Sequence, residues 1–534
     1  MNHPLTSRPW WQDAVIYEIY PRSFADGNND GTGDLKGITS KLDYLRFTLG
    51  VDAIWICPFY GSPMADLGYD IRDHTAIAPV FGTMGDFEKL LTQARRRDLR
   101  VIVDFVPDRT SDQHPWFLSS RLSRDDPKRD WYIWADPTPD GAPPSDWTDQ
   151  SGQSCWEYHW ASDQYYLHSF HRRLPLLNWH NPEVRRAMLD VLSFWLDKGV
   201  DGVHIDIAHT ATAPSEPHGA ANPRHLIGRH PADGAKQLTD HLSSGTHICL
   251  QTIRLGLESH SRRTGHDVVA IDHDTVTPHD HQARFFNTGT GPHLPFNPVL
   301  ARATWTAVGL AGGIEAAEAT LPAKAWPHHA LSHNNRPRLT TTVGTHNARI
   351  AAMLMLTLRG TPTLYYGDEL GLPDLLQDRR NRLDPLGRDR FRAPMAWTGA
   401  PRGGFSKKST VQPWLPLTEP IHHYNVESQL ADPGSLLNLY RRLIALRRRV
   451  PALRIGEYVT VSEAPPSCLC FLRTTGAQTI LVAVNLDDQP HELDLPNAGR
   501  VLADTTGLPP ADTFVKHKVL EPRNGAVIEL HESL

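Results

Sequence analysis

The chain has little cysteine, no long apolar run and no large excess of either charge. Its five cysteines are an odd number without the spacing of a metal site, which disfavours a disulfide scaffold or a zinc centre. No window approaches the roughly 18 consecutive apolar residues of a transmembrane helix, and residues 1–9 lack the apolar core of a secretory signal. The formal net charge of −6 does not favour nucleic acid or a membrane as a partner. These absences predict a cytoplasmic protein with reduced, mostly buried thiols.

The remaining composition is typical of a large globular enzyme. A hydrophobic fraction of 40% and a charged fraction of 21% are ordinary, and 534 residues predict one large domain with additions. Within Gly199–His209 a short apolar run ends in Asp206, after a helical pattern over Pro182–Lys198. Such a run is typical of a buried parallel strand. In a barrel of parallel strands, polar side chains at the carboxyl strand ends face the active site, so Asp206 is a catalytic candidate.

Further apolar runs indicate the same alternation of strand and helix on both sides of a long interruption. Val15–Tyr20, Ala53–Pro58 and Val101–Pro107 are predicted strands. Residues 110–180 lose the alternation and are rich in Pro, Asp and Trp, which is typical of a functional insertion. From about Gly456 the pattern changes to short alternating strands, which predicts a small all-β domain at the end of the chain.

Several motifs follow these predicted strands. They are Asp66-Leu67-Gly68-Tyr69-Asp70, Asp104-Phe105-Val106-Pro107-Asp108-Arg109, Gly202-Val203-His204-Ile205-Asp206, Leu331-Ser332-His333-Asn334-Asn335-Arg336-Pro337-Arg338 and Arg392-Ala393-Pro394-Met395-Ala396-Trp397. Through them the chain resembles the α-amylase family of glycoside hydrolases (family 13), and bacterial α-glucosidases and oligo-1,6-glucosidases in particular. The resemblance implies an α/β fold, a (β/α)8 TIM barrel formed by residues 1–107 and 181–455. It also implies an inserted domain B at 108–180 and a C-terminal β-sandwich domain at 456–534.

The resemblance also implies roles for residues of the predicted pocket. In the family, the aspartate that matches Asp206 is the nucleophile. The tyrosine that matches Tyr69 stacks on the sugar, and the aspartate that matches Asp70 binds sugar hydroxyls. Four further residues at motif positions are expected to bind substrate: Arg109, Asn334, Arg338 and Arg392.

Four of these motif positions depart from the family's pattern. Arg109 replaces a histidine, and His204 replaces the arginine that orients the nucleophile. Asn334 and Asn335 replace a His-Asp pair, of which the aspartate supports the transition state in the family. The scaffold motifs around them are intact, which indicates a remodelled pocket with a retained function.

A fifth departure concerns the proton donor. We expect the fifth strand at His247–Thr252, where Gln251 replaces the family's general acid/base glutamate. An amide donates no proton to a leaving group, a contribution worth typically ~10²–10⁴-fold in rate. Hydrolysis is therefore predicted to be absent or very weak. Asp206 or His204 would instead act as a base, and Gln251 and Asn335 would be the altered catalytic positions.

Charge suggests which reaction replaces hydrolysis. At five matched positions the family has four carboxylates and one arginine, whereas this chain keeps two carboxylates and gains Arg109. A less negative pocket favours an anionic ligand. Proteins of acarbose-type antibiotic biosynthesis on this scaffold act as pseudo-glycosyltransferases, which join an activated cyclitol to an amino sugar through a C–N bond. We therefore expect a transferase with a nucleotide- or phosphate-activated sugar or cyclitol donor. The alternatives are an inactive carbohydrate-binding pseudoenzyme and a weak α-glucosidase that uses Asp206.

An acidic loop is a candidate metal site, and no organic cofactor is expected. Its oxygen-bearing residues alternate around glycines, which is typical of a site for a hard cation, although a solvated acidic turn has the same composition. In related α-glucosidases this loop holds a structural Ca²⁺, one ligand being the carbonyl at the position of Thr32. Calcium is therefore favoured over magnesium, with Asp26, Asn28, Asp30, Thr32 and Asp34 as the ligands.

Overall fold

The computed structural model describes residues 8–148, 152–207, 233–272, 291–322, 325–376, 380, 382–384, 386–461, 463–465, 467–506 and 513–530. The chain forms two compact units. The first unit contains residues 1–56, 89–101 and 296–534, and the second unit contains residues 57–88 and 102–295.

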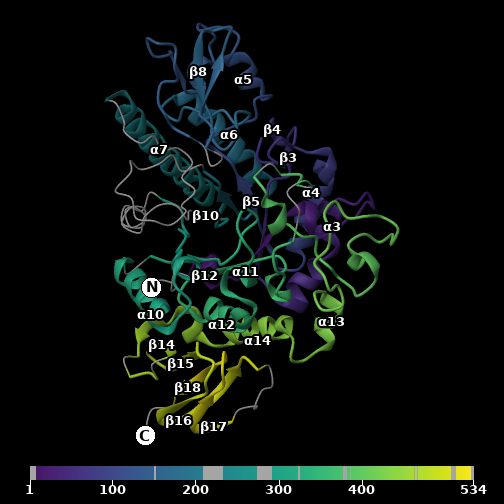
Figure 1. Ribbon diagram of the computed structural model, residues 1–534, viewed down its shortest axis with the longest axis vertical. Coiled ribbons are helices and arrows are strands. Elements are labelled where there is room, and N and C mark those ends of the chain that lie inside the picture. Colours follow the sequence, from purple (N-terminus) through teal and green to yellow (C-terminus); the bar gives the residue numbers. More distant parts are fainter. Residues whose placement is uncertain are drawn as a thin grey trace. The chain divides into compact units, whose positions relative to one another are not determined.

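The first unit is built on parallel strands in the order β2-β1-β12-β11. All their residues are buried, as expected of a parallel sheet covered on both faces. Helix α12 packs against α14 in this unit (Figure 1). The strands are β1 (Ile16–Ile19), β2 (Ala53–Ile56), β11 (His328–His329) and β12 (Thr361–Tyr365). The helices are α1 (Trp10–Asp13), α2 (Pro21–Phe24), α3 (Leu35–Ser40), α9 (Val299–Arg302), α10 (Ala307–Thr320), α11 (Leu339–Val343), α12 (Ala348–Thr357), α13 (Val426–Ala431), α14 (Leu436–Arg449) and α15 (Pro451–Ile455).

The second unit carries the parallel strands β5, β9 and β10. Strand β5 (Arg100–Phe105) begins in the first unit and ends in the second, whereas helix α4 (Met84–Arg95) begins in the second unit and ends in the first. The elements that continue this unit are β9 (Gly202–Ile205), β10 (Val269–Asp272), α6 (Pro182–Lys198) and α7 (Asp233–Thr264). Short strands β3 (Tyr60–Gly61) and β4 (Asp73–Ile77) form an antiparallel pair.

The predicted bounds of helix α6, Pro182–Lys198, are confirmed, and the residues at its two ends explain where it begins and ends. The side chain of Asn181 accepts a hydrogen bond from the backbone N–H of Glu183, and Pro182 occupies the first turn. Gly199 ends the helix in the left-handed conformation, with a φ of 97°. The helix therefore leads directly into β9, the strand that precedes Asp206.

The insertion after β5 has a core of its own. Strands β6 (Trp134–Ala135), β8 (Gln164–Leu167) and β7 (Trp156–His159) form an antiparallel sheet in that order, with α5 (Pro115–Ser120) preceding them. Trp147 and Trp156 lie in this core, so these two tryptophans have a packing role. The core cluster consists of Ile133, Trp147, Cys155, Trp156, Tyr165, Leu167 and Leu176.

The C-terminal part of the first unit is an antiparallel β domain, as predicted. The described strands form one six-stranded sheet, in the order β13-β14-β15-β18-β16-β17, where two sheets of a sandwich were expected. Alternating residues of these strands supply one buried cluster, which is why the sequence pattern identified strands but not their grouping. The strands are β13 (Glu457–Thr460), β14 (Cys468–Thr475), β15 (Gln478–Asn485), β16 (His491–Asp504), β17 (Phe514–Leu520) and β18 (Gly525–Leu530).

All five cysteines are buried, in agreement with the predicted reduced thiols. None of the described helices combines the length and the apolar character that crossing a bilayer requires.

Candidate functional site

The carboxyl halves of β5 and β9 place a histidine beside an aspartate in the second unit. Asp104 and His204 are register partners of the two parallel strands, so both side chains lie on the same face. His204 Nδ1 lies 2.8 Å from Asp104 Oδ1, and both residues are buried. The imidazole is therefore positioned by the neighbouring strand. A role for His204 as a base stays a prediction.

Asp206 follows β9 directly and is held by an arginine from the segment after β5. The backbone N–H of Asp206 donates to the carbonyl of Phe105 at 2.9 Å. Arg109 Nη2 donates to Asp206 Oδ2 at 2.6 Å, and Arg109 Nη1 donates to Asp108 Oδ1 at 2.7 Å. The guanidinium lies over the ring of Phe170, 5.1 Å from its centroid. Three sides of the arginine are thus fixed by the protein.

Arg109 is a buried cation between two carboxylates. Burial alone would lower the pKa of Arg109, but the charges of Asp108 and Asp206 raise the pKa above its usual value. The side chain of Arg109 is 2% exposed, whereas that of Asp206 is 21% exposed. Asp206 therefore keeps an accessible carboxylate, while both terminal nitrogens of Arg109 bond acidic side chains. Binding of an anionic ligand by Arg109 stays a prediction, and the charge count behind it did not include Asp108.

The contact between Arg109 and Asp206 bears on the predicted departures at positions 109 and 204. The resemblance implies an orienting arginine at the position of His204, on the strand of the nucleophile. Here a guanidinium reaches Asp206 from the segment after β5, through Arg109. Asp206 therefore has a charged partner.

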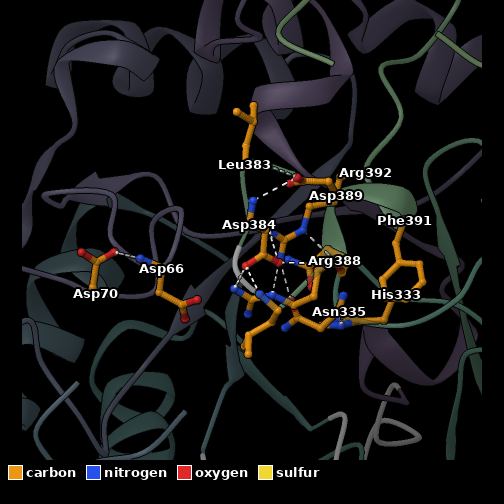
Figure 2. Close-up of polar contacts among 12 residues, drawn as sticks. Asp66, Asp70, His333, Asn335, Leu383, Asp384, Arg388, Asp389, Phe391 and Arg392 are labelled. Carbon is orange, nitrogen blue, oxygen red and sulfur yellow. Dashed lines mark hydrogen bonds and ion pairs between the residues drawn. The ribbon is translucent and has the colours of Figure 1, made fainter. Parts of the chain in front are cut away.

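Tyr69 and Asp70 are buried within their own loop. Asp70 is fully buried and accepts hydrogen bonds from Ser62 Oγ at 2.8 Å and from the N–H of Ala65 at 2.7 Å. It also accepts from the N–H of Asp66 at 2.9 Å (Figure 2). Burial raises the pKa of Asp70. Tyr69 is 2% exposed. Asp70 thus organises its own loop, and its contact with sugar hydroxyls stays a prediction.

Gln251 is not on a strand, which corrects the predicted fifth strand. Residues His247–Thr252 lie within α7, a helix of 32 residues, and Gln251 is exposed there. A short apolar run does not distinguish a strand from a segment of a buried helix, and here the helical spacing decides the outcome. The buried positions around it are Cys249, Leu250, Ile253 and Leu257.

The strand beside β9 is β10, so the family's fifth-strand position belongs there. In its register Ile271 pairs with His204 and Asp272 pairs with Ile205. Alternation therefore puts Asp272 on the face of Ile205. His273 and Asp274 follow in the sequence, outside the described residues. The argument that the general acid has been lost at Gln251 consequently no longer stands.

In the first unit, the loop after β11 carries the two predicted asparagines. The N–H of Asn334 donates to Glu18 Oε1 at 3.2 Å, and Glu18 also lies 3.4 Å from His333 Nε2. Arg392 donates through Nε to the carbonyl of Asn334 at 2.9 Å and through Nη2 to Asn335 Oδ1 at 2.6 Å. Because a guanidinium only donates, Oδ1 of Asn335 faces Arg392 and the amide nitrogen faces away from it.

Arg392 is in turn held by a buried acidic segment (Figure 2). Asp384 accepts from Arg388 Nε at 2.6 Å and lies 4.0 Å from Arg392 Nη1. Burial alone would raise the pKa of Asp384, but the hydrogen bonds and charge of Arg388, with the charge of Arg392, lower it to about 2. Arg392 itself is fully buried. It thus positions Asn335, and its contact with substrate stays a prediction.

Arg338 also has a structural role, and its contact with substrate stays a prediction. Its side chain is fully buried and lies over the rings of Tyr365 and Tyr366. Nη1 donates to the carbonyl of Tyr366 at 2.8 Å, and Nη2 donates to that of Ala393 at 3.4 Å. The guanidinium therefore fixes the chain after β12.

The acidic loop before α3 largely satisfies its own polar groups. Asp26 accepts from the N–H of Asn29 at 2.6 Å, from the N–H of Gly31 at 2.8 Å and from Ser406 Oγ at 2.5 Å. Asp34 caps α3 by accepting from the N–H of Gly37 at 2.6 Å. Among the residues that the structure describes, no group of three or more His, Cys, Asp or Glu is arranged to hold a metal ion.

Three charged or polar residues that the motif analysis did not select help to build the site: Glu18, Asp104 and Asp384. Asp104 is detectable in principle, because it lies opposite His204 when the two strand patterns are aligned in parallel. Glu18 lies 316 residues before Asn334 in the sequence, and Asp384 lies outside the helices and strands. Such contacts depend on the tertiary fold.

Comparison with known proteins identifies the family. The model of the α-amylase catalytic domain matches residues 18–456, and that of the maltogenic amylase C-terminal domain matches residues 458–513. The chain belongs to the α-amylase family. It is 37% identical to a probable α-glucosidase of Rhizobium meliloti, over 92% of this chain and 91% of that protein. It is 32% identical to the oligo-1,6-glucosidase of Parageobacillus thermoglucosidasius, over 92% of each chain.

A solved structure supports the fold along nearly the whole chain. A variant of isomaltulose synthase from Erwinia rhapontici, in complex with its natural substrate sucrose, is 30% identical with a TM-score of 0.85. The match covers 99% of this chain and 100% of that one. The predicted α/β class, with a TIM-type barrel and a C-terminal antiparallel β domain, is therefore confirmed, and so is the resemblance to α-glucosidases and oligo-1,6-glucosidases.

Proposed function

We propose that the protein is an enzyme acting on α-glucosides and that Asp206 is its nucleophile. One observation carries this proposal: Asp206 is partly exposed at the end of β9 and bonds a buried guanidinium at 2.6 Å. A carboxylate held in this way is charged, oriented and accessible. The names of the relatives, an α-glucosidase and an oligo-1,6-glucosidase, support the same substrate class.

The proposed reaction has two displacements at the anomeric carbon. An oxygen of Asp206 forms a bond to that carbon while the bond to the leaving oxygen breaks, and a covalent glycosyl-enzyme results. Water or a second sugar hydroxyl then displaces Asp206 and loses its proton to a base. Oδ2 bonds Arg109, so Oδ1 is the attacking atom in this proposal. The leaving oxygen takes a proton unless it leaves as a stable anion.

The test compares two substrates that differ in their need for a proton. α-Glucosyl fluoride needs little acid assistance, whereas maltose and isomaltose need a full proton transfer. The wild-type protein should turn over the fluoride, and Asp206→Asn should abolish the turnover. Azide should restore activity to Asp206→Ala and give β-glucosyl azide, because the small anion replaces the carboxylate.

A matched control removes a carboxylate of similar type elsewhere. Asp197 is an exposed residue of α6 that pairs with Arg263 at 3.0 Å, and Asp197→Asn should retain activity. Binding of glucose without turnover of any substrate would contradict the proposal and favour the carbohydrate-binding pseudoenzyme.

A pseudo-glycosyltransferase is the second candidate, favoured by the amide at position 335. Asn335 offers its ligand an N–H donor instead of the family's carboxylate, because Arg392 bonds its oxygen. Such a group suits a substrate whose transferred part carries hydrogen-bond acceptors, such as a nucleotide-activated cyclitol. A nucleoside diphosphate that raises the melting temperature, with no turnover of α-glucosyl fluoride, would favour this candidate over the first.

We also propose that the loop Asp26–Asp34 binds a Ca²⁺ ion with a structural role. Carboxylate, amide and carbonyl oxygens suit this hard cation. Burial raises the pKa of Asp34, and the charges of Asp26 and Asp30 contribute, which indicates a concentration of negative charge. Ca²⁺ should raise the melting temperature of protein treated with a chelator, and Asp30→Ala should remove that response. An equal response to Mg²⁺ would contradict the choice of calcium.

A further inference from the structure

Asp108 and Asp206 share one guanidinium. Arg109 Nη1 donates to Asp108 Oδ1 at 2.7 Å, while Arg109 Nη2 donates to Asp206 Oδ2 at 2.6 Å. Nη1 also donates to the backbone carbonyl of Asp206, at 3.4 Å. Because a guanidinium is planar, a carboxylate that holds one terminal nitrogen also sets the direction of the other. The position of Asp108 therefore determines how Arg109 meets Asp206.

The segment that carries Asp108 is fixed by contacts that do not involve Asp206. The backbone carbonyl of Asp108 accepts a hydrogen bond from the N–H of Leu177 at 2.8 Å. The carbonyl of Pro107 accepts from Trp179 Nε1, also at 2.8 Å. Both donors lie before helix α6 in the sequence, whereas Asp206 follows β9, the strand after that helix. Asp108 thus has an anchor of its own within the second unit, from which it holds Arg109.

The contacts of Arg109 differ in what they can fix. The guanidinium lies over the ring of Phe170, 5.1 Å from its centroid, and this attraction to a ring face leaves rotation in the plane free. The direction within the plane depends on the two carboxylates. Asp206 loses its charge when it becomes the ester of the glycosyl-enzyme, which weakens its bond to Arg109. Asp108 keeps its charge through both displacements, so it is the contact that can keep the arginine aligned.

We propose that Asp108 is a positioning residue for the nucleophile Asp206. It holds Arg109 at the angle at which Nη2 meets Oδ2 of Asp206, and it keeps that angle while Asp206 is esterified. The side chain of Asp108 is 11% exposed against 21% for Asp206, so the more accessible carboxylate is the one that attacks. The inference rests on the proposed function, because it requires Asp206 to react with the sugar.

Removal of the Asp108 carboxylate tests this role. In the full-length protein, Asp108→Ala should lower kcat/KM for α-glucosyl fluoride by about 10–100-fold, as for the outer partners that orient metal ligands. Asp108→Asn keeps an oxygen that accepts from Arg109, so it should recover part of that loss. The decrease should lie in kcat, with the dissociation constant for glucose unchanged, because Asp108 acts on the nucleophile and not on the sugar.

A double-mutant cycle with Arg109 separates positioning from other roles. In the Arg109→Ala background, Asp108→Ala should cause no further loss of kcat/KM, because Asp108 then has no route to Asp206. A full additional loss in that background would overturn the inference, since it would show that Asp108 acts on the sugar or on the fold. Thermal unfolding reports whether each variant is folded, and Asp108→Asn takes the place of Asp108→Ala in the cycle if the latter is unfolded.

Asp112 provides a matched control further along the same segment. Its Oδ2 pairs with Arg173 Nε at 3.2 Å, and Asp112→Ala should retain wild-type turnover. A loss as large as that of Asp108→Ala would overturn the inference, because it would be a general effect of this segment. Wild-type protein without turnover of α-glucosyl fluoride would overturn the proposed function and the inference together. Turnover that Asp206→Asn abolishes but Asp108→Ala preserves would overturn the inference alone.

Discussion

At the scale of single residues, the reactivity of Asp206 depends on which strand supplies its cationic partner. A carboxylate nucleophile needs a fixed orientation, and a guanidinium gives it through a planar, permanently charged donor. In this protein Arg109 supplies that donor, while His204 turns to Asp104 on the neighbouring strand. Neither substitution would be tolerated easily without the other. The pair is therefore best tested as a unit.

An exchange experiment tests this coupling. Arg109→His removes the ion pair to Asp206 and should lower kcat/KM for α-glucosyl fluoride by about 10²-fold, the usual effect of losing one oriented donor. His204→Arg alone should also be harmful, because it places a second guanidinium close to Arg109. The double variant restores the family's arrangement and should be more active than either single variant. A double-mutant cycle measures the coupling. Strictly additive effects would show that the two positions act independently.

A second residue-scale prediction concerns Asp368, at the start of the short helix η5 (Asp368–Leu370) after β12. Ser332 Oγ donates to both of its carboxylate oxygens, at 2.7 and 2.6 Å. Burial raises the pKa of Asp368 to about 7, from an ordinary 3.8. The folded state therefore holds the proton more tightly than the unfolded state does. This stabilising contribution is complete below pH 3.8 and is lost as the pH rises through about 7.

Asp368→Asn should remove that dependence while keeping an acceptor for Ser332. The variant and the wild type should have similar free energies of unfolding near pH 4. Above pH 7 the variant should be the more stable of the two, by a few kcal/mol, because about 1.4 kcal/mol corresponds to each pKa unit. Urea unfolding at pH 4, 6 and 8 measures the difference. Parallel stability curves at all three values would contradict the assignment to Asp368.

At the scale of elements, strands and helices with strong end signals were predictable, and elements of ambiguous period were not. Helix α6 has an asparagine cap, a proline in the first turn and a glycine after the end, and its bounds were predicted correctly. The run His247–Thr252 has no such ends, because it lies inside α7. The motif around Asp206 located the site, but the contact with Arg109 was not predictable, since it joins residues 97 apart in the sequence.

Helix α7 also gives a specific prediction for Gln251. The sequence pattern placed Gln251 at the position of the family's general acid/base glutamate. In the structure this side chain is exposed on α7, so Gln251→Glu should change kcat/KM for α-glucosyl fluoride and for maltose by less than about twofold, as for an ordinary surface change. Steady-state kinetics with both substrates measures the effect. A large gain with maltose alone would show that Gln251 acts as the acid position after all.

At the scale of the whole molecule, the C-terminal β domain belongs to the same compact unit as strands β1, β2, β11 and β12. Strands β14 and β15 pack on α15. Arg473 of β14 is fully buried, and it donates to the carbonyls of Leu453 at 3.1 Å and of Gly456 at 2.8 Å. Burial and the charge of Arg447 lower the pKa of Arg473. A sequence boundary at residue 456 therefore does not mark two parts that fold separately.

Truncation after Ile455 tests this dependence. The shortened chain should be insoluble or should lack cooperative unfolding, because it exposes the apolar face of α15 and removes the Arg473 guanidinium that donates to the carbonyl of Thr357. Arg473→Met in the full chain is the finer test, and it should lower the free energy of unfolding by about 1–3 kcal/mol, the cost of unsatisfied buried carbonyls. Circular dichroism and urea unfolding measure both changes. A soluble fragment of residues 1–455 that unfolds cooperatively, with an unperturbed Arg473→Met, would instead show that the β domain is dispensable for the fold of the first unit.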